Sequence, residues 1–234
     1  MIVLRTGGPV LRTRLTRILP KDWGSGDDRM ALREDGQVLA LCDGASEGWD
    51  GAGWAEALAL TLCRIEDPER AVEAARAGRR SGIRGDGWLE SAARARGSWS
   101  TALAVRLEAG GRRVAVSAVG DTVLFILDGC RPVASFPLDD PGAFGSTPDL
   151  VAENGTETDV FARAEFSLAE LRRPRIALLT DALAARALSE PEAGRAALWA
   201  FLLGSPEAAF RAWARAEIEA GRLRLDDLSL LAAV

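Results

Sequence analysis

Hydrophobic positions in the first hundred residues change their spacing several times, and each change marks an expected element. Residues 10–19 mix β-branched and basic side chains with partial alternation, which predicts an exposed outer strand. Two short apolar runs, 30–32 and 37–42, flank the turn pair Asp35-Gly36 and therefore predict a hairpin. Helical spacing then predicts three helices, at residues 51–65, at 68–77 with an end at Gly78, and at 88–96.

The second half of the chain begins with a change to the two-residue period of strands. Apolar runs separated by glycine-containing turns predict an antiparallel meander, with strands at residues 99–107, 114–119, 123–127 and 131–136. Proline and glycine are frequent at 137–160, where we expect an irregular excursion over the surface. The remaining expected elements are a buried strand at 175–181, helices at 182–188, 194–203 and 206–220, and a last strand within 224–234.

Acidic residues stand where apolar strands are expected to begin or end. Asp43 follows the run 39–42, and Gly44 lets the backbone turn there because it has no Cβ. A carboxylate at the mouth of a buried strand loses hydration, so it must be paired, protonated or bound to a cation. Similar positions are held by Asp121, Asp181 and Asp226. Each of these acids alone is more typical of a turn or a helix cap than of a ligand.

Four such acids together favour a shared site. If the strands bring them close, mutual repulsion raises their pKa values unless divalent cations neutralise them. Ligand sets made only of oxygen favour Mg²⁺ or Mn²⁺ over zinc or copper. The pair Asp27-Asp28, in a glycine-rich loop typical of a solvated turn, joins Asp43 only if the hairpin register allows it, and the sequence leaves that open.

Composition narrows the possible chemistry. The 234 residues, 48% hydrophobic and 27% charged, fit one large domain better than two small ones. The chain contains no histidine, which excludes Ser-His-Asp and Cys-His catalysis and histidine-ligated zinc. Its three cysteines lack metal-ligand spacing and no apolar run reaches bilayer length, so we expect a soluble protein of the reducing cytoplasm. The net charge of −5 gives no reason to expect nucleic acid or an anionic membrane as a partner.

Five segments, taken in chain order, carry a family resemblance. They are Asp27-Asp28-Arg29, Asp43-Gly44, Gly120-Asp121-Thr122, Thr180-Asp181 and Asp226-Asp227-Leu228-Ser229, and Ser98-Trp99-Ser100-Thr101-Ala102 adds a similar strand opening. In this order they resemble the motifs of the PP2C-type (PPM family) metal-dependent protein serine/threonine phosphatases, in a divergent bacterial form. The resemblance spans about residues 20–234. It implies hydrolysis of phosphoserine and phosphothreonine in phosphorylated proteins, as a part of bacterial signalling.

The resemblance also implies a fold. That fold is α+β, a four-layer α-β-β-α sandwich with two central antiparallel sheets. It would form a single domain over residues 1–234, with a flap-like excursion at about 137–170 beside the active site.

The resemblance further implies a binuclear Mn²⁺ or Mg²⁺ centre with a third, weaker site. Asp43 would bridge the two ions, the Gly44 carbonyl would bind one, and Asp181 and Asp226 would hold the other. Asp27 and Asp28 would act through metal-bound waters, and Asp121 would bind the third ion. Asp43, Asp181 and Asp226 would thus be catalytic through metal-bound water, because two cations ~3.5–4 Å apart activate a bridging water and neutralise phosphoryl oxygens.

The chain departs from the family pattern in four places. Ala45 replaces the histidine frequent after Asp-Gly, Ala182 replaces the glycine after Thr-Asp, and Asp27 replaces glutamate. Trp23 stands where the family commonly has a phosphate-binding arginine, a role that Lys21, Arg17 or Arg29 could take. We therefore rank an active phosphatase first. The alternatives are a pseudophosphatase that serves as a binding or regulatory module with impaired metal binding, and, last, acids that only cap strands and pair with arginines.

Overall fold

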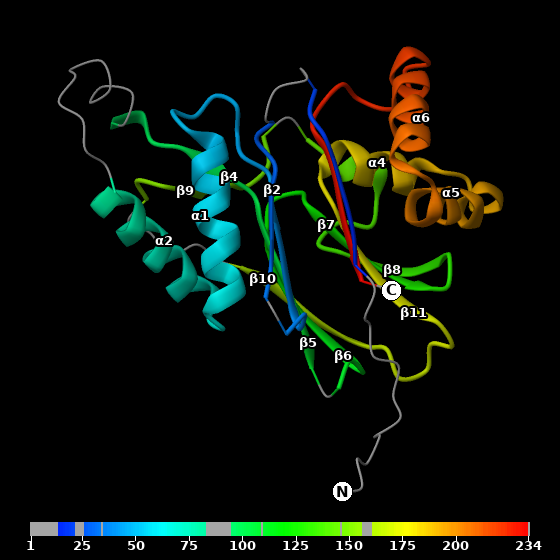
Figure 1. Ribbon diagram of the computed structural model, residues 1–234, viewed down its shortest axis with the longest axis horizontal. Helices are drawn as coiled ribbons and strands as arrows, with labels where there is room; N and C mark the ends of the chain where they lie inside the picture. The colour runs from blue at the N-terminus through cyan, green and yellow to red at the C-terminus, as the bar shows by residue number, and fades with distance from the viewer. Residues whose placement is uncertain are drawn as a thin grey trace, which may run out of the picture.

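Two five-stranded antiparallel sheets lie face to face, and helices pack against the outer face of each (Figure 1). The computed structural model describes residues 14–21, 26–33, 35–82, 95–108, 110–145, 147–155 and 161–233. The first sheet has the order β1 (Arg14–Leu19), β12 (Leu228–Ala233), β11 (Pro174–Leu179), β7 (Val123–Asp128) and β8 (Arg131–Phe136). The second has the order β10 (Ala162–Ser167), β6 (Arg113–Val119), β5 (Ala102–Glu108), β3 (Val38–Cys42) and β2 (Arg29–Leu32).

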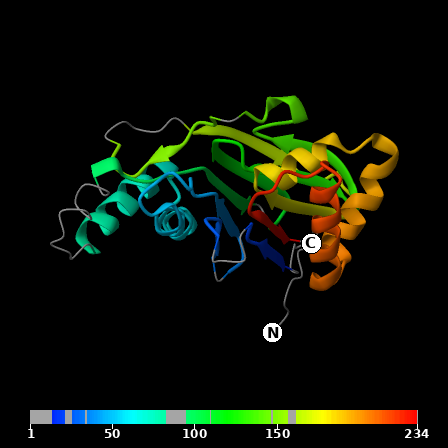
Figure 2. The same cartoon turned by 90° about the horizontal axis from the view of Figure 1, so that it is seen from above.

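Helices cover both sides of this pair of sheets, as the view from above also shows (Figure 2). The second sheet is covered by α1 (Gly51–Arg64) and α2 (Pro68–Gly82), and the first by α4 (Asp181–Ser189), α5 (Glu192–Gly204) and α6 (Glu207–Glu219). The short elements are the ribbon of β4 (Trp99–Ser100) with β9 (Val151–Ala152) and the 3₁₀ turn η1 (Pro141–Ala143). Within the described residues, no helix is both long and apolar enough to cross a membrane.

Three apolar cores fill the interfaces between the four layers. Strand β3 contributes to two of them: Val38, Ala40 and Cys42 pack toward α1 and α2, whereas Leu39 and Leu41 lie between the sheets. All five residues of β3 are buried, because successive side chains point to opposite faces and both faces are covered. The expected fold class, an α+β four-layer sandwich with two antiparallel sheets, is confirmed.

Helix α1 begins at a side-chain cap and is tied to a distant segment. The Asp50 carboxylate accepts a hydrogen bond from the Gly53 amide at 3.0 Å, which satisfies one of the free amides of the first turn. The buried indole of Trp54 donates to the Val151 carbonyl at 2.8 Å. This bond fastens β9 against α1.

The expected meander is wrong at one turn. Strands β5 and β6 pair in one sheet and β7 and β8 pair in the other, so β6 and β7 are not partners. The chain crosses between the sheets at Gly120, whose φ of +93° favours glycine. The crossing lets Phe125 face the helices α4 to α6 while Leu124 packs between the sheets.

Two further expectations need correction. Helix α2 does not end at Gly78 but continues to Gly82, because beyond Gly78 the helix is fixed by ion pairs of Arg79 with Asp50 and Glu153 at 2.9 and 2.8 Å. The flap-like stretch expected at 137–170 contains a regular strand, β10, which pairs with β6 at the edge of the second sheet. The helix expected at 88–96 falls mostly on residues 83–94, which lie outside the described residues.

Candidate metal and phosphate site

Acidic residues converge at one end of the two sheets because of strand register. Arg29 of β2 pairs with Cys42 of β3, so the preceding Asp28 and the following Asp43 come side by side. In the other sheet β11 ends and β12 begins at the same level, where the Thr180 amide donates to the Ser229 carbonyl at 3.2 Å. The segments around residues 28, 43, 181 and 226 therefore meet although they are far apart in the chain.

A cleft of about 500 Å³ opens at this end of the molecule. Its walls carry five of the predicted acids together with Asp227 and two cations. The acids are Asp27, Asp43, Asp121, Asp181 and Asp226, the cations are Lys21 and Arg224, and Gly44, Ala45, Ser46, Glu47, Thr101, Gly145, Thr147, Pro148 and Leu150 complete the lining. Gly145, Thr147, Pro148 and Leu150 belong to the stretch expected to be a flap, so part of that stretch borders the cleft.

Asp28 lies beneath the cleft. It is 2% exposed, and its Oδ2 accepts a hydrogen bond from the Thr180 hydroxyl at 3.2 Å. Its Oδ1 is buried with no hydrogen-bond partner, and so is the nearby Ser229 hydroxyl. Burial, more than any neighbouring charge, raises the pKa of Asp28 to about 7. An orphaned carboxylate oxygen of this kind is costly in the metal-free protein.

Asp43 is fixed through its backbone, which leaves its carboxylate for the cleft. The Asp43 amide donates to the Thr101 hydroxyl at 2.9 Å. The Asp43 carbonyl accepts from the Thr101 amide at 2.9 Å and from the Ser100 hydroxyl at 2.8 Å. Burial and then the charge of Asp28 hold the pKa of Asp43 well above its usual range. Burial also raises the pKa of Asp121. The site thus brings together acidic groups that are partly or fully withdrawn from solvent.

Gly44 allows a close approach that no other residue permits. A Cβ at this position would lie 2.5 Å from the Gly51 carbonyl oxygen at the start of α1. The Gly44 amide donates to the Asp27 carbonyl at 3.3 Å, which holds the 27–28 segment beside β3. Glycine here is therefore explained by packing, whatever its carbonyl binds.

Asp227 is a structural residue of the site that the sequence did not single out. Only 4% exposed, it accepts hydrogen bonds from the Lys21 amide at 2.8 Å and the Asp27 amide at 2.6 Å. One carboxylate therefore holds both ends of the glycine-rich loop at the cleft. Asp227 belongs to the motif-like segment Asp226-Asp227-Leu228-Ser229, but the sequence alone assigned it no role.

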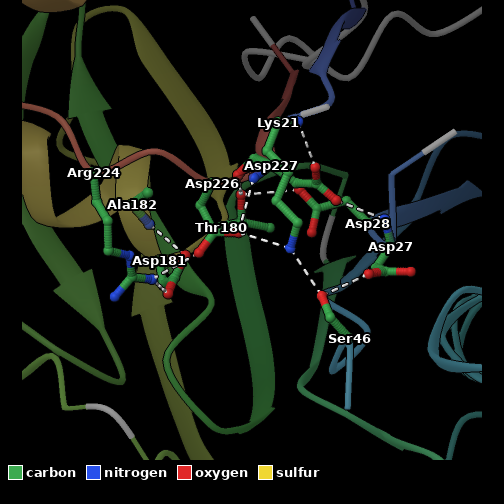
Figure 3. A network of polar contacts seen from close by, with 10 residues as sticks. All are labelled: Lys21, Asp27, Asp28, Ser46, Thr180, Asp181, Ala182, Arg224, Asp226 and Asp227. Carbon is green, nitrogen blue, oxygen red and sulfur yellow. Dashed lines mark hydrogen bonds and ion pairs between the residues drawn. The ribbon is translucent and has the colours of Figure 1, made fainter. Parts of the chain in front are cut away.

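The two cations occupy different parts of the cleft (Figure 3). Lys21 Nζ donates to the Ser46 hydroxyl at 2.8 Å and lies 3.6 Å from Asp226 Oδ1, and Ser46 in turn donates to Asp27 Oδ2 at 2.8 Å. Although burial acts to lower the pKa of Lys21, Asp226 and its other acidic neighbours outweigh that effect and raise it. Lys21 therefore stays positively charged.

Arg224, which the sequence did not suggest, bridges two predicted ligands. Its guanidinium pairs with Asp181 Oδ2 and lies 3.3 Å from Asp226 Oδ2. Asp181 begins α4, and its other oxygen accepts a hydrogen bond from the Ala182 amide. Both oxygens of Asp181 thus have partners within the chain.

The structure also shows where residues lie that differ from the family motifs. Ala45 lines the cleft and its side chain offers no proton donor, while Ala182 lies in the first turn of α4 and is buried in the core. Arg29, proposed as a phosphate ligand, turns its guanidinium to the Gly26 and Asp28 carbonyls at 3.0 and 2.8 Å and does not line the cleft. Trp23 lies outside the described residues.

The fit of a divalent cation differs between the two ends of the cleft. At the Asp43 end the donors are oxygens with raised pKa values, and Asp28 offers an unpartnered oxygen, which suits a hard ion. At the other end Arg224 already forms ion pairs with both Asp181 and Asp226. Across the described part of the chain, no three acidic or cysteine side chains gather as a ready ligand set.

Comparison with known proteins establishes the fold. No family model matches the sequence, and no curated protein matches it significantly. The Mycobacterium tuberculosis serine/threonine phosphatase PstP/Ppp has 17% identity and a TM-score of 0.59 over 95% of this chain and 98% of that chain. The PPM Ser-Thr phosphatase MsPP from Mycobacterium smegmatis, in complex with cacodylate, has 18% identity and a TM-score of 0.58 over 96% and 99%.

A third structure of similar fold contains metal ions. It is the catalytic domain of the phosphatase PstP in complex with two manganese ions, with 17% identity and a TM-score of 0.52 over 94% of this chain and 97% of that chain. The chain described here therefore has the fold of PP2C-type serine/threonine phosphatases.

Proposed function

We propose that the protein hydrolyses phosphoserine or phosphothreonine in a phosphorylated protein, with Mn²⁺ or Mg²⁺ bound at the cleft. One observation carries this proposal: acids from five separate segments line one solvent-open cleft in a fold shared with serine/threonine phosphatases. The proposal treats residues 1–234 as one phosphatase domain of the cytoplasm.

Each group has a proposed role in this site. Asp43 would contribute to both ions, the Gly44 carbonyl would hold one, and Asp181 and Asp226 the other. Asp27 and Asp28 would act through waters on these ions, and Asp121 would hold a third ion. Bound there, such ions supply an activated water and neutralise phosphoryl oxygens.

Lys21 is the side chain best placed to bind the phosphoryl group. Its ammonium lies on the cleft wall, and the Asp227 carboxylate fixes its backbone. A compact ammonium is a point donor for a phosphate oxygen, so Lys21 would orient the substrate and offset its charge. The Ser46 hydroxyl accepts a hydrogen bond from Lys21 and donates one to Asp27, so it helps to position the ammonium.

A phosphopeptide assay tests the proposal. Mn²⁺-dependent release of phosphate by the wild-type protein should fall at least about 100-fold in Asp43→Asn, as expected when charge stabilisation of the transition state is lost. Asp139→Asn, the same change at an exposed position away from the cleft, should keep full activity. Equal rates in the wild type and Asp43→Asn would contradict the proposed role of Asp43.

The pseudophosphatase remains a second candidate because Arg224 fills the Asp181–Asp226 end. It predicts a folded protein with no phosphatase activity at millimolar Mn²⁺. A phosphopeptide bound by the inactive protein, measured by fluorescence polarisation, would favour this binding role over the enzymatic one.

A further inference from the structure

The charge balance of the cleft is uneven. At one end Arg224 contacts both Asp181 and Asp226, and Lys21 also lies 3.6 Å from Asp226. At the other end, no ion pair to Asp28 or Asp43 is formed by the described residues, and Asp28 Oδ1 is buried without a hydrogen-bond partner. One end is thus neutralised by the chain itself, while the other lacks a cation.

The Arg224 side chain contacts Asp181 but remains accessible to solvent, so it can leave this contact. It lies in the segment between α6 and β12, and its side chain is 51% exposed, whereas the side chain of Asp181 is only 12% exposed. A guanidinium that reaches a buried carboxylate from solvent keeps a path back to solvent. A cation arriving at Asp181 must therefore displace Arg224, because Asp181 Oδ1 already accepts the Ala182 amide.

We propose that Arg224 is a resident cation that competes with a divalent metal ion for Asp181 and Asp226. The wild-type protein then binds one ion tightly at the Asp43 end, and a second ion only weakly, after Arg224 has swung out. This inference rests on the proposed metal-dependent function. It goes further because it proposes that Arg224, which lies outside the family motifs, limits the number of tightly bound ions to one.

The physical basis is that both cations need the same oxygens. Two positive groups cannot share the Asp181 carboxylate at contact distance without strong repulsion. The guanidinium donates a charge-assisted hydrogen bond to Asp181, which is nearly buried, and also forms an ion pair with Asp226. Its loss therefore costs more than that of an isolated surface ion pair. Removing the guanidinium should therefore tighten binding of the second ion.

Mn²⁺ titration, followed by isothermal calorimetry and by the electron paramagnetic resonance of free Mn²⁺, tests the inference without any activity assay. We expect one tight site in the wild type and two sites in Arg224→Gln, with the second site at least about tenfold tighter than in the wild type, which corresponds to about 1.4 kcal/mol. Arg224→Lys, which keeps the charge but loses the planar fork, should give an intermediate affinity and replaces the glutamine variant if that variant does not fold.

Arg113→Gln is the matched control. Arg113 is 52% exposed and, like Arg224, lies near two acids, Glu108 at 3.3 Å and Glu165 at 3.4 Å, but it is not among the residues that line the cleft. Its replacement should leave both the number and the affinity of Mn²⁺ sites unchanged.

The remaining outcomes distinguish a failure of the Arg224 competition from a failure of the proposed metal-dependent function. Tight Mn²⁺ binding with the same stoichiometry and affinity in the wild type and both Arg224 variants would overturn the competition and leave the proposed phosphatase intact. Folded wild-type and variant proteins that bind no Mn²⁺ would overturn both. Tightening in Arg113→Gln equal to that in Arg224→Gln would show a general charge effect and would also overturn the competition.

Discussion

Individual side chains in this protein show two ways of holding a buried carboxylate. Asp227 and Glu217 are nearly buried but have complete sets of hydrogen-bond donors. Asp28 is as deeply buried, yet one of its oxygens has no partner. Satisfied carboxylates of the first kind stabilise the fold, whereas an unsatisfied one is retained at a cost in stability. This contrast distinguishes structural acids from candidate ligands.

Glu217 gives a prediction for the first kind. It accepts hydrogen bonds from Arg222 at 2.6 Å and from Arg186 at 2.7 Å, and these arginines lower its pKa from 4.5 to about 2. Because the folded-state pKa lies below the unfolded one, the stabilisation is present above about pH 4.5 and is lost as the pH falls toward 2. Glu217→Gln should cost about 1–2 kcal/mol in urea unfolding at pH 7.

The loss in free energy of unfolding caused by Glu217→Gln should become smaller as the pH is lowered from about 4.5 toward 2. Glu219→Gln, an exposed position near the end of the same helix, should change stability by less than about 0.5 kcal/mol at either pH. A difference between Glu217→Gln and the wild type that does not vary with pH would contradict the pairing.

At the scale of elements, local pattern predicted most helices and strands. The hairpin of β2 and β3, the helix α1, and the helices α4 to α6 were all expected within a few residues of their bounds. Each carries its own signal, a period of apolar residues or a turn pair, that needs no distant contact. The crossing at Gly120 was missed because a Gly-Asp-Thr turn also suits a tight hairpin, and only packing against two different layers decides between them.

Helix α2 offers a test of why its end was misplaced. A Cβ added to Gly78 meets no atom within 4 Å, so alanine fits there without a clash and lowers the backbone entropy of the unfolded chain. Gly78→Ala should therefore stabilise the protein by about 0.5–1 kcal/mol in thermal or urea unfolding.

Gly53→Ala is the contrasting substitution, because glycine in α1 has no such space. A Cβ at Gly53 would lie 2.2 Å from Asp50 Oδ2 and would disturb the cap of the helix. This variant should lose stability by about 1 kcal/mol. Destabilisation by both substitutions would contradict the prediction that alanine is tolerated at position 78.

The site was foreseeable only in part. Asp43, Asp181 and Asp226 could be named because each follows or precedes an apolar run and matches a motif. Arg224 and Asp227 could not, because their roles depend on partners 43 and more than 200 residues away, respectively. Sequence neighbours reveal strand ends, but not which oxygens already have a partner.

At the scale of the whole molecule, the four layers explain why acids can be concentrated at one end. Three separate apolar cores stabilise the sandwich and offset the cost of the repelling charges at the cleft. We propose that these charges are held for a divalent cation.

Thermal unfolding of wild type and Asp43→Asn, each with and without millimolar Mn²⁺, tests that claim most directly. Without metal, Asp43→Asn should melt at the same temperature as the wild type or higher, because a buried, repelling carboxyl group has been neutralised. With Mn²⁺ the order should reverse, since only the wild type gains stability from ion binding. A wild-type melting temperature that Mn²⁺ leaves unchanged, together with a loss of stability in metal-free Asp43→Asn, would contradict the account.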